Sequence, residues 1–340
     1  MKFSQKICFI GLLFVGFILG TYSCNKDKSG TSTDKTLIPT LSTAAVSSVT
    51  LSSAISGGSI ASDGGGDIIA SGVCWSLTVN PTIGNSKTTD GSATGSFASS
   101  ITGLTSNTSY YVRAYATNSA GTGYGEQYQF NTLVDYSGQT RTVSDIDGNS
   151  YPTIGIGSQV WMAANLKTTK YRNVSLIGTT SSATLDITSE SAPKYQWAYG
   201  GIESNVGIYG RLYTWHAVTD SRGVCPTGWH VPSDAEWSTL TTFAGGESIA
   251  GGKLKETGTV HWNTPNTLTT NLSGFTALPG GDREVTGTFG SLGSNGGWWS
   301  TSENTAVTGW FRFLFFDSGI VSRGYFSKSY GFAVRCIKDN

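Results

Sequence analysis

The clearest local structure in this sequence is encoded by CPTGWHVPSDAEW, residues 225–237. Ser233 and Glu236 have the spacing of a capping box, in which each side chain bonds a free backbone N–H at the start of a helix. The helix that follows has one apolar face, formed by Trp237, Leu240 and Ala244. Two glycines at 245–246 then end the pattern. The stretch therefore predicts a helix over 233–244, which begins eight residues after Cys225 and packs its apolar face against a core.

Upstream, the chain begins with the pattern of a secretory signal. Lys2 and Lys6 precede an apolar run over residues 7–19, and small or polar residues lead to Cys24. This order of charge, apolar residues and small residues is typical of a secretory signal, and the run is too short for a permanent membrane span.

Residues 19–24 resemble the lipobox of bacterial lipoproteins, in which the signal is removed before a cysteine that carries acyl chains. Tyr22 is bulkier than the usual residue there, and the leucine lies further from the cysteine than usual. We expect a signal over 1–23 and lipid attachment at Cys24; cleavage near Ser23 without acylation is the alternative. Buried acyl chains contribute about 0.8 kcal/mol per methylene, so two or three would hold the protein on a membrane.

Cys8 lies within the signal, and the remaining three cysteines fall in two groups. Cys225 and Cys336 lie in the same C-terminal region, and in an exported chain such a pair is more typical of a disulfide than of a metal or catalytic couple. The bridge would close a loop of about 110 residues and contribute roughly 4 to 5 kcal/mol on the chain-entropy model. Cys74 stands alone in an apolar run, which predicts a buried, inert thiol.

Composition sets further bounds. The chain has 340 residues, 45 of them glycine, with 12% aromatic and 13% charged residues, which favours turn-rich β structure in two domains. The formal net charge is zero and no basic run is present, so a nucleic-acid partner is not expected. The three histidines show no metal-ligand spacing, and we expect no metal and no cofactor.

Residues 24–37 are polar and small and predict a flexible tether. Residues 38–133 then consist of short runs rich in Val, Ile, Thr and Ser, separated by Gly, Asp and Asn, a pattern typical of strands. Within them, alternation predicts one buried face, formed by Tyr110, Val112, Ala114 and Ala116.

This region resembles a fibronectin type III domain. Leu104 precedes Tyr110 by six residues across the turn-forming stretch 106–108, which is similar to the tyrosine corner of that fold. Residues 118–125 resemble its F–G turn, and Trp75 would be the core tryptophan. The resemblance implies a β-sandwich that acts as a spacer or a protein-binding module.

Residues 135–340 form a second region, with nine of the ten tryptophans. A second short helix over 249–256 and a final strand over 330–337 are predicted there. Its motifs are, in order, residues 145–151, 159–167, 210–215, 225–232, 275–281, 298–300 and 331–336. This series resembles the Fibrobacter succinogenes major paralogous domain of secreted and lipoprotein chains, with Ala164 where an acidic residue is expected. The resemblance implies an α+β fold like that of C-type lectins and formylglycine-generating enzymes, but no defined activity.

Three kinds of chemistry can be compared with simpler interpretations. Residues 145–149 (DIDGN) have the oxygen spacing of the start of a calcium loop, but Ile156 stands where the later acidic ligand would be, which favours a tight turn. Formylglycine-generating chemistry needs a pair of reactive cysteines near the C-terminus, and only Cys336 lies there. Asn266, after Thr264 and Pro265, lacks the carboxylate partner of a calcium-dependent sugar site.

The candidate ligand surface is built around the tryptophan pair of the C-terminal region, since tryptophan faces stack on sugar rings. Its members are Trp298, Trp299, Glu303, Asn304, Trp310, Asp282 and Arg283. The alternative is that one or both of the paired tryptophans belong to the core. Four carboxylates could also supply a pair for glycoside hydrolysis, although solvated surface charge is the default: Asp282, Glu284, Glu303 and Asp317.

Together these patterns predict a mostly β protein with some α structure, a fibronectin type III-like sandwich followed by an α+β C-type lectin-like domain. The function they favour is that of a lipoprotein attached to the outer membrane, at the cell surface or on the periplasmic face. It would display a non-catalytic module that binds polysaccharide or protein. An exported enzyme that acts on polysaccharide and a purely structural envelope protein are the alternatives.

Overall fold

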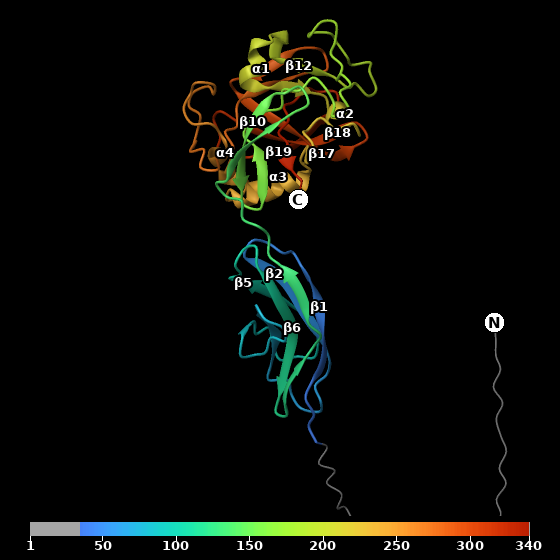
Figure 1. The fold of residues 1–340 in the computed structure, drawn as a ribbon, viewed down its shortest axis with the longest axis vertical. Coiled ribbons are helices and arrows are strands. Elements are labelled where there is room, and N and C mark those ends of the chain that lie inside the picture. Colours follow the sequence, from blue (N-terminus) through green and yellow to red (C-terminus); the bar gives the residue numbers. More distant parts are fainter. Residues whose placement is uncertain (1–34, 340) are drawn as a thin grey trace, which may run out of the picture.

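The computed structural model describes residues 35–339. It shows two separate bodies joined by one short connection (Figure 1). The predicted signal over 1–23, the lipid-attachment residue Cys24 and most of the tether lie outside the described residues. Within residues 35–339 no helix is both long enough and apolar enough to cross a bilayer.

The first body is a β-sandwich of two sheets. One sheet has the order β1-β2-β5, formed by β1 (Thr40–Ser47), β2 (Ser53–Ser62) and β5 (Gly95–Thr102). The other has the order β4-β3-β6-β7, with β8 also paired to β6. Its strands are β3 (Ala70–Ser76), β4 (Ser86–Lys87), β6 (Ser109–Asn118), β7 (Gly121–Tyr124) and β8 (Tyr128–Asn131).

The sandwich core confirms the predicted alternation on β6. Tyr110, Val112, Ala114 and Ala116 are all buried. The Tyr110 hydroxyl accepts a hydrogen bond of 3.0 Å from the backbone N–H of Thr105, so the tyrosine bonds back to the preceding turn. Trp75 is half-buried against the same core. Cys74 is a buried free thiol, and burial raises its pKa, as an inert residue requires.

The connection between the bodies is tied to each of them. The N–H of Leu133 donates to the carbonyl of Thr50 in the sandwich, and the N–H of Tyr136 donates to the carbonyl of Gly157 in the second body. Only two residues separate these attachment points along the chain.

The second body contains two five-stranded sheets and a small two-stranded one. The first has the order β14-β20-β11-β10-β9, formed by β9 (Thr140–Ser144), β10 (Ser150–Ile156), β11 (Gln159–Met162), β14 (Trp229–His230) and β20 (Ile337–Lys338). The second has the order β16-β15-β17-β18-β19, formed by β15 (Gly280–Arg283), β16 (Phe289–Leu292), β17 (Asn295–Thr305), β18 (Thr308–Phe315) and β19 (Ser322–Ser327). The small sheet pairs β12 (Gln196–Ala198) with β13 (Arg211–Tyr213).

The second body also contains short helices (Figure 1). They are η1 (Tyr199–Gly201), α1 (Ser204–Tyr209), α2 (Trp215–Val218), α3 (Asp234–Phe243) and α4 (Glu247–Leu254). Residues 35–339 are therefore mostly β with some helix, as the sequence patterns predicted.

Helix α3 confirms the prediction from residues 225–237. Ser233 Oγ accepts from the N–H of Glu236, and the N–H of Ser233 donates to the Glu236 carboxylate, so the capping box is complete. The apolar face Trp237, Leu240 and Ala244 is buried. The second predicted helix is displaced: α4 spans Glu247–Leu254, two residues earlier than the predicted range at both ends.

The predicted final strand over 330–337 is wrong, although the segment is almost entirely buried. Gly331, Phe332 and Ala333 make single bridges to three different partners, and only Ile337–Lys338 is a strand. The segment passes from one sheet to the other through the core, so residues on both of its sides are buried. Alternating residue types here do not mark one exposed and one buried face.

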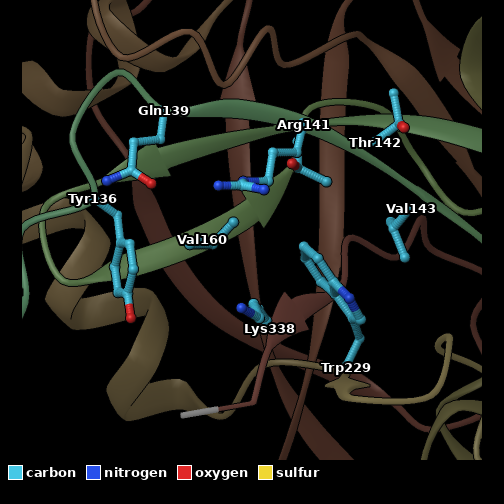
Figure 2. Close-up of a pocket in the computed structure, with 9 residues that line it drawn as sticks. Tyr136, Gln139, Arg141, Thr142, Val143, Val160, Trp229 and Lys338 are labelled. Carbon is cyan, nitrogen blue, oxygen red and sulfur yellow. The ribbon is translucent and has the colours of Figure 1, made fainter.

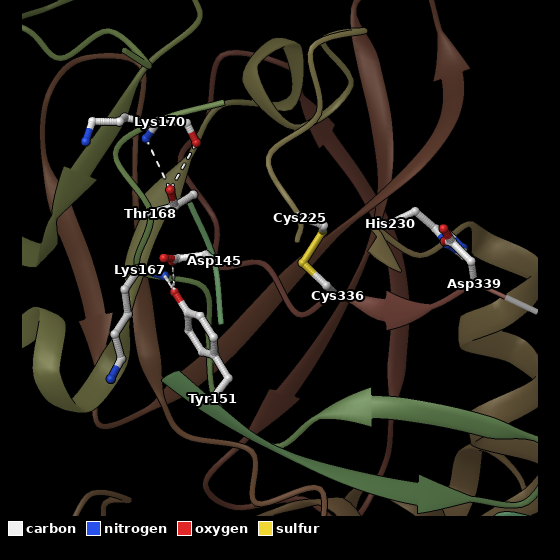
Figure 3. Close-up of a disulfide and its surroundings, with 9 residues drawn as sticks. All are labelled: Asp145, Tyr151, Lys167, Thr168, Lys170, Cys225, His230, Cys336 and Asp339. Atoms are coloured by element: carbon white, nitrogen blue, oxygen red, sulfur yellow. Dashed lines mark hydrogen bonds and ion pairs between the residues drawn. A yellow bond between two sulfur atoms is a disulfide. The ribbon is translucent and has the colours of Figure 1, made fainter. Parts of the chain in front are cut away.

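The disulfide between Cys225 and Cys336 confirms the predicted pair, with an S–S distance of 2.05 Å (Figure 3). It joins the segment before α3 to the segment before β20. Both cysteines are buried in the second body, and the bridge closes the chain between them, a sequence separation of 111, into one covalent loop.

Residues 145–149 form the predicted tight turn. The Asp145 carboxylate accepts from the backbone N–H groups of Asp147 and Asn149 and from the Tyr151 hydroxyl, which Figure 3 shows beside it. The Asp147 carboxylate pairs with Lys170 at 2.8 Å, and hydrogen bonds from this lysine and from residues 168–169 outweigh burial and lower the pKa of Asp147 to about 2. The two aspartates thus hold the turn against the 168–170 loop.

Buried cations hold the long loops of the second body. Arg335 donates to the carbonyls of Phe275 and Thr276, and its guanidinium lies 4.1 Å from the Phe275 ring centroid. Lys255 donates to the carbonyls of Phe315 and Ser318 in the same way. Burial lowers the pKa of Lys255 to about 8. Backbone carbonyls, in place of carboxylates, surround these charges, so each cation fixes the path of a loop.

Candidate functional site

The two paired tryptophans of the predicted ligand surface are core residues, so that part of the prediction is wrong. Trp298 and Trp299 are 1% and 0% exposed. Their indole N–H groups donate to Asn165 Oδ1 and to the Tyr213 carbonyl. The physical reason is that β17 lies between β15 and β18 and is covered on both faces, so both directions of alternation lead into a core.

Arg283 is also unavailable to a ligand. It is fully buried, donates to the carbonyls of Ala183 and Leu185, and its guanidinium lies 4.0 Å from the Trp197 ring centroid. The arginine therefore fixes the 183–185 loop.

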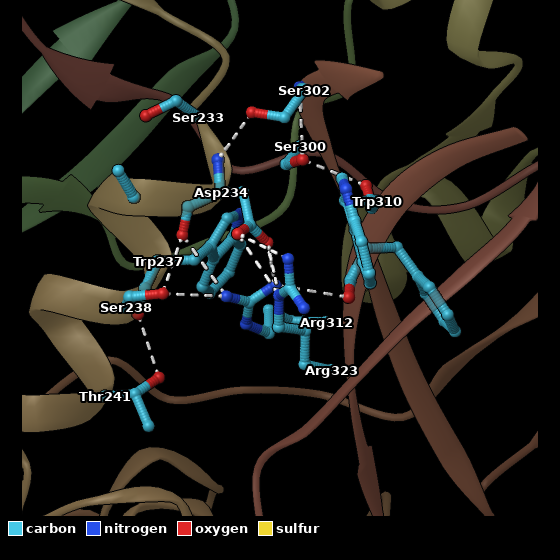
Figure 4. A network of polar contacts seen from close by, with 12 residues as sticks. Ser233, Asp234, Trp237, Ser238, Thr241, Ser300, Ser302, Trp310, Arg312 and Arg323 are labelled. Atoms are coloured by element: carbon cyan, nitrogen blue, oxygen red, sulfur yellow. Dashed lines mark hydrogen bonds and ion pairs between the residues drawn. The ribbon is translucent and has the colours of Figure 1, made fainter. Parts of the chain in front are cut away.

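Three further predicted residues lie on the β17–β18 hairpin and contact other protein groups. Glu303 pairs with Lys328 at 2.9 Å, and Asn304 donates to the Thr308 hydroxyl at 3.1 Å. Trp310 is half-buried, with the Arg323 guanidinium 3.4 Å from its ring centroid. Figure 4 shows this arginine and Arg312 converging on Asp234 next to the tryptophan.

Among the members of the predicted ligand surface, Asp282 lines a cavity of about 320 Å³. We call it the aromatic cavity, and its aromatic walls are Phe311, Phe313, Phe315, Phe326, Tyr330 and Phe332. Glu284 lines it as well, while Glu303 and the exposed Asp317 do not. Ser291 and Asn295 supply uncharged polar side chains to the lining.

The sequence builds the aromatic walls by alternation on β18. Phe311, Phe313 and Phe315 are two residues apart, so they project from one face of the strand. Glycines leave room for the rings: a Cβ at Gly297 would lie 2.9 Å from the Phe332 ring, and one at Gly324 would lie 2.8 Å from the Phe311 ring. The alternation of Phe311, Phe313 and Phe315 is visible in the sequence, and it is the pattern from which one wall of this cavity could be predicted.

The rings form one continuous cluster. Phe311 stacks on Phe313 at a centroid distance of 4.9 Å and on Phe332 at 4.8 Å. Phe326 contacts Tyr330 at 4.9 Å and Phe332 edge-on at 5.5 Å. Phe326 is 39% exposed, so the cluster extends from the core to the surface and presents open ring area in the cavity.

The aromatic cavity is lined by two acidic side chains, Asp282 and Glu284, and by no basic one. Burial and the neighbouring charge of Glu284 raise the pKa of Asp282 above its usual range, against a hydrogen bond from Ser291. Burial raises the pKa of Tyr330 too, and the charges of Glu284 and Asp282 add to the rise. Within residues 35–339 neither carboxylate takes part in an ion pair. The site thus combines aromatic walls with two carboxylates that lack a basic partner in the described chain.

A second cavity, of about 410 Å³, lies on the five-stranded sheet that contains β20. Arg141 and Lys338 lie on either side of Val160 in Figure 2, and Trp229 lies at one side. Trp229 is 8% exposed, so it offers little ring surface to a ligand. The aromatic cavity presents more open ring area and is the stronger candidate.

Comparison with known proteins bears on the second body most directly. The sequence profile described as the Fibrobacter succinogenes major domain matches residues 154–338, more than half of the chain. No curated protein matches the chain.

Among solved structures, the chain is similar to the sensor domain of the anti-sigma factor RsgI4 of Pseudobacteroides cellulosolvens. That solution structure is 17% identical with a TM-score of 0.22, over 28% of this chain and 76% of the other. A shorter form of the same sensor domain gives 16% and 0.23, over 29% and 99%. A crystal structure of part of titin gives 25% and 0.21, over 28% and 31%.

The match over residues 154–338 includes both cysteines of the disulfide, helix α3 and the whole aromatic cavity. This chain belongs to the Fibrobacter succinogenes major domain family.

Proposed function

We propose that the protein is a cell-envelope lipoprotein that displays a non-catalytic binding module, whose ligand is a polysaccharide or a protein. The observation that carries the proposal is the aromatic cavity. Open ring area beside a few polar groups in a concave site is the usual composition of a ligand-binding site. Phe326, at 39% exposure, gives a ligand direct access to these rings.

The lipid anchor in this proposal rests on the sequence around Cys24. The anchor would hold the chain on the outer membrane, and the tether and the sandwich would extend the second body away from it. Exposure at the cell surface suits a binding module better than the periplasmic face, because large ligands are available there.

The finer fold assignments belong to the same proposal. The hydrogen bond from Thr105 to the Tyr110 hydroxyl supports a fibronectin type III-like sandwich, since a tyrosine that bonds back to upstream backbone is a feature of such domains. The disulfide between Cys225 and Cys336 and the loop-rich second body support a C-type lectin-like domain.

Two experiments test the proposal. Intact cells are treated with protease and then probed with an antibody against the second body. The antibody should no longer detect this body if the module is displayed outside the cell. Binding of the purified chain to panels of polysaccharides and proteins should then reveal a ligand that Phe326→Ala weakens at least tenfold.

Tyr325→Ala is the matched control for the binding experiment. Tyr325 is 58% exposed on the same strand but contacts Trp310 and does not line the aromatic cavity. Equal loss in both variants, or binding that neither variant changes, would show that the cavity is not the binding site.

One observation favours a second function, an exported enzyme that acts on polysaccharide. Asp282 and Glu284 line one cavity, and burial raises the pKa of Asp282 as a general acid requires. Release of reducing sugar that Asp282→Asn abolishes would establish this function. If the wild type were inactive on a broad panel of polysaccharides, the enzyme function would be contradicted and the binding function would remain.

A further inference from the structure

We propose that the aromatic cavity binds the side chain of a lysine or arginine presented by a protein ligand. This inference rests on the binding function proposed above and names the chemistry of its ligand. It follows from the charge of the cavity, the nature of its walls and the polar groups that the cavity lacks.

The ionisable side chains of the cavity are all acidic. Asp282 and Glu284 line the cavity, the lining contains no basic side chain, and no ion pair within residues 35–339 involves either carboxylate. Two neighbouring carboxylates in partly buried surroundings repel each other, and a cation between them removes both the repulsion and the unpaired charge. An ammonium or guanidinium group is therefore the complementary partner.

Aromatic rings surround the two carboxylates. Phe313, Phe326 and Tyr330 are all partly exposed and line the same cavity as the carboxylates. Aromatic ring faces attract cations, and they also pack against methylene groups. A basic side chain offers both features, because a cationic head is carried on an apolar stem.

The small number of polar groups in the cavity distinguishes a basic side chain from an amino sugar, which also carries an ammonium group. A sugar ring bears hydroxyls around its edge, and each hydroxyl that loses water without gaining a partner weakens binding. Besides the two carboxylates, the only polar side chains that the lining offers are Ser291, Asn295 and Tyr330. The stem of lysine has no polar atoms, so it packs against the aromatic lining without leaving a hydrogen-bonding group unpaired, whereas a sugar ring does not.

The test is isothermal titration calorimetry with the full chain and three probes. The first is a short peptide, acetyl-Gly-Ser-Lys-Ser-Gly-amide; the second is the same peptide with its lysine acetylated; the third is a glucosamine oligomer. The lysine peptide is expected to bind at low salt, at least tenfold more tightly than the acetylated peptide and than the amino sugar. Raising the salt concentration should weaken its binding.

The decisive variant is Asp282→Asn with Glu284→Gln, which removes both charges and keeps the shapes. It should lower the affinity for the lysine peptide at least tenfold. The matched control is Glu126→Gln with Asp317→Asn, which removes two exposed charges outside the cavity and should leave the affinity unchanged.

Thermal unfolding of the same variants distinguishes a binding role from a structural one. Partly buried carboxylates without a basic partner destabilise the free protein, so the double variant should unfold at a higher temperature than the wild type while it loses binding. A lower unfolding temperature would assign the two carboxylates a structural role and overturn the inference.

The remaining outcomes separate this inference from the broader function. Tighter binding of the glucosamine oligomer would contradict the inference that the ligand group is a basic side chain, but it would still support the proposed binding module. Binding of none of the three probes would also overturn it, and the polysaccharide and protein panels would then decide the broader proposal.

Discussion

Asn165 Oδ1 accepts a hydrogen bond of 2.9 Å from Nε of Arg335, which lies 170 residues later in the chain. The same oxygen accepts from the indole of Trp298 at 2.9 Å, and the amide nitrogen of Asn165 donates to the Tyr209 carbonyl at 2.8 Å. Asn165, Arg335 and Trp298 are all buried. One short side chain therefore joins the 163–167 loop, β17 and the C-terminal segment.

Asn165→Leu is expected to lower the free energy of unfolding of the second body by about 3 to 5 kcal/mol. The substitution leaves two buried donors, one of them charged, without their acceptor. Asn165→Asp should cost less, because a carboxylate still accepts both hydrogen bonds and opposes the charge of Arg335. Urea denaturation followed by tryptophan fluorescence measures both, since nine of the ten tryptophans lie in this body. Equal losses for the two variants would contradict the assigned role of the Asn165 oxygen.

The sequence predicted those parts of the fold that local patterns encode. The capping box at Ser233 and Glu236 located α3, and alternation from Tyr110 located the buried face of β6. Arg335 shows where such patterns fail. Its partners include backbone carbonyls, which every residue type carries, so no spacing of residues reveals that this charge is buried.

The candidate site was predicted only in part for a similar reason. Trp298 and Trp299 gave the same apolar signal that an exposed stacking surface would give, and the position of β17 inside its sheet decided between the two interpretations. Asp282 was identified by type, but the alternating phenylalanines from Phe311 were not connected to it. The link between them depends on how β15 and β18 both pair with β17.

Replacing both Cys225 and Cys336 with serine is expected to lower the free energy of unfolding by roughly 4 to 5 kcal/mol on the chain-entropy model. The bridge spans a sequence separation of 111 residues, so its loss frees a long loop in the unfolded chain. Urea denaturation of the oxidised wild type and the double variant measures the difference. Cys74→Ala is the control, because Cys74 lies in the sandwich and should not change the unfolding of the second body. Unchanged stability of the second body after loss of the bridge would contradict the prediction.

Asp234 pairs with two arginines of very different exposure, and this difference predicts unequal losses. Its carboxylate lies 2.5 Å from Arg312, whose side chain is 3% exposed, and 3.0 Å from Arg323, whose side chain is 38% exposed (Figure 4). Asp234→Ala should cost about 3 to 5 kcal/mol, because it leaves the buried Arg312 without its carboxylate. Arg323→Ala should cost about 1 kcal/mol, the range of an exposed pair together with its contact on Trp310. Denaturation of the two variants side by side checks the order, and a larger loss for Arg323→Ala would reverse the argument.

His230 makes the stability of the second body depend on pH. Its Nδ1 lies 2.6 Å from the carboxylate of Asp339, and its Nε2 lies 2.8 Å from that of Glu236 in α3. Burial alone would lower the pKa of His230, but the hydrogen bonds to Asp339 and Glu236 outweigh it and raise the pKa above the usual value.

The folded protein binds this proton more tightly than the unfolded chain does. The stabilisation from His230 is therefore fully present below the pKa of the unfolded chain, about 6.5, and is lost as pH rises through the pKa of the folded protein. The free energy of unfolding of the wild type should therefore exceed that of His230→Asn by the most near pH 6 and by less near pH 8.5. Urea denaturation of both proteins across this range measures the difference. Asp339→Asn should reduce the pH dependence by removing one of the two carboxylates, and a difference that stays constant from pH 6 to 8.5 would show that the imidazole does not gain a proton on folding.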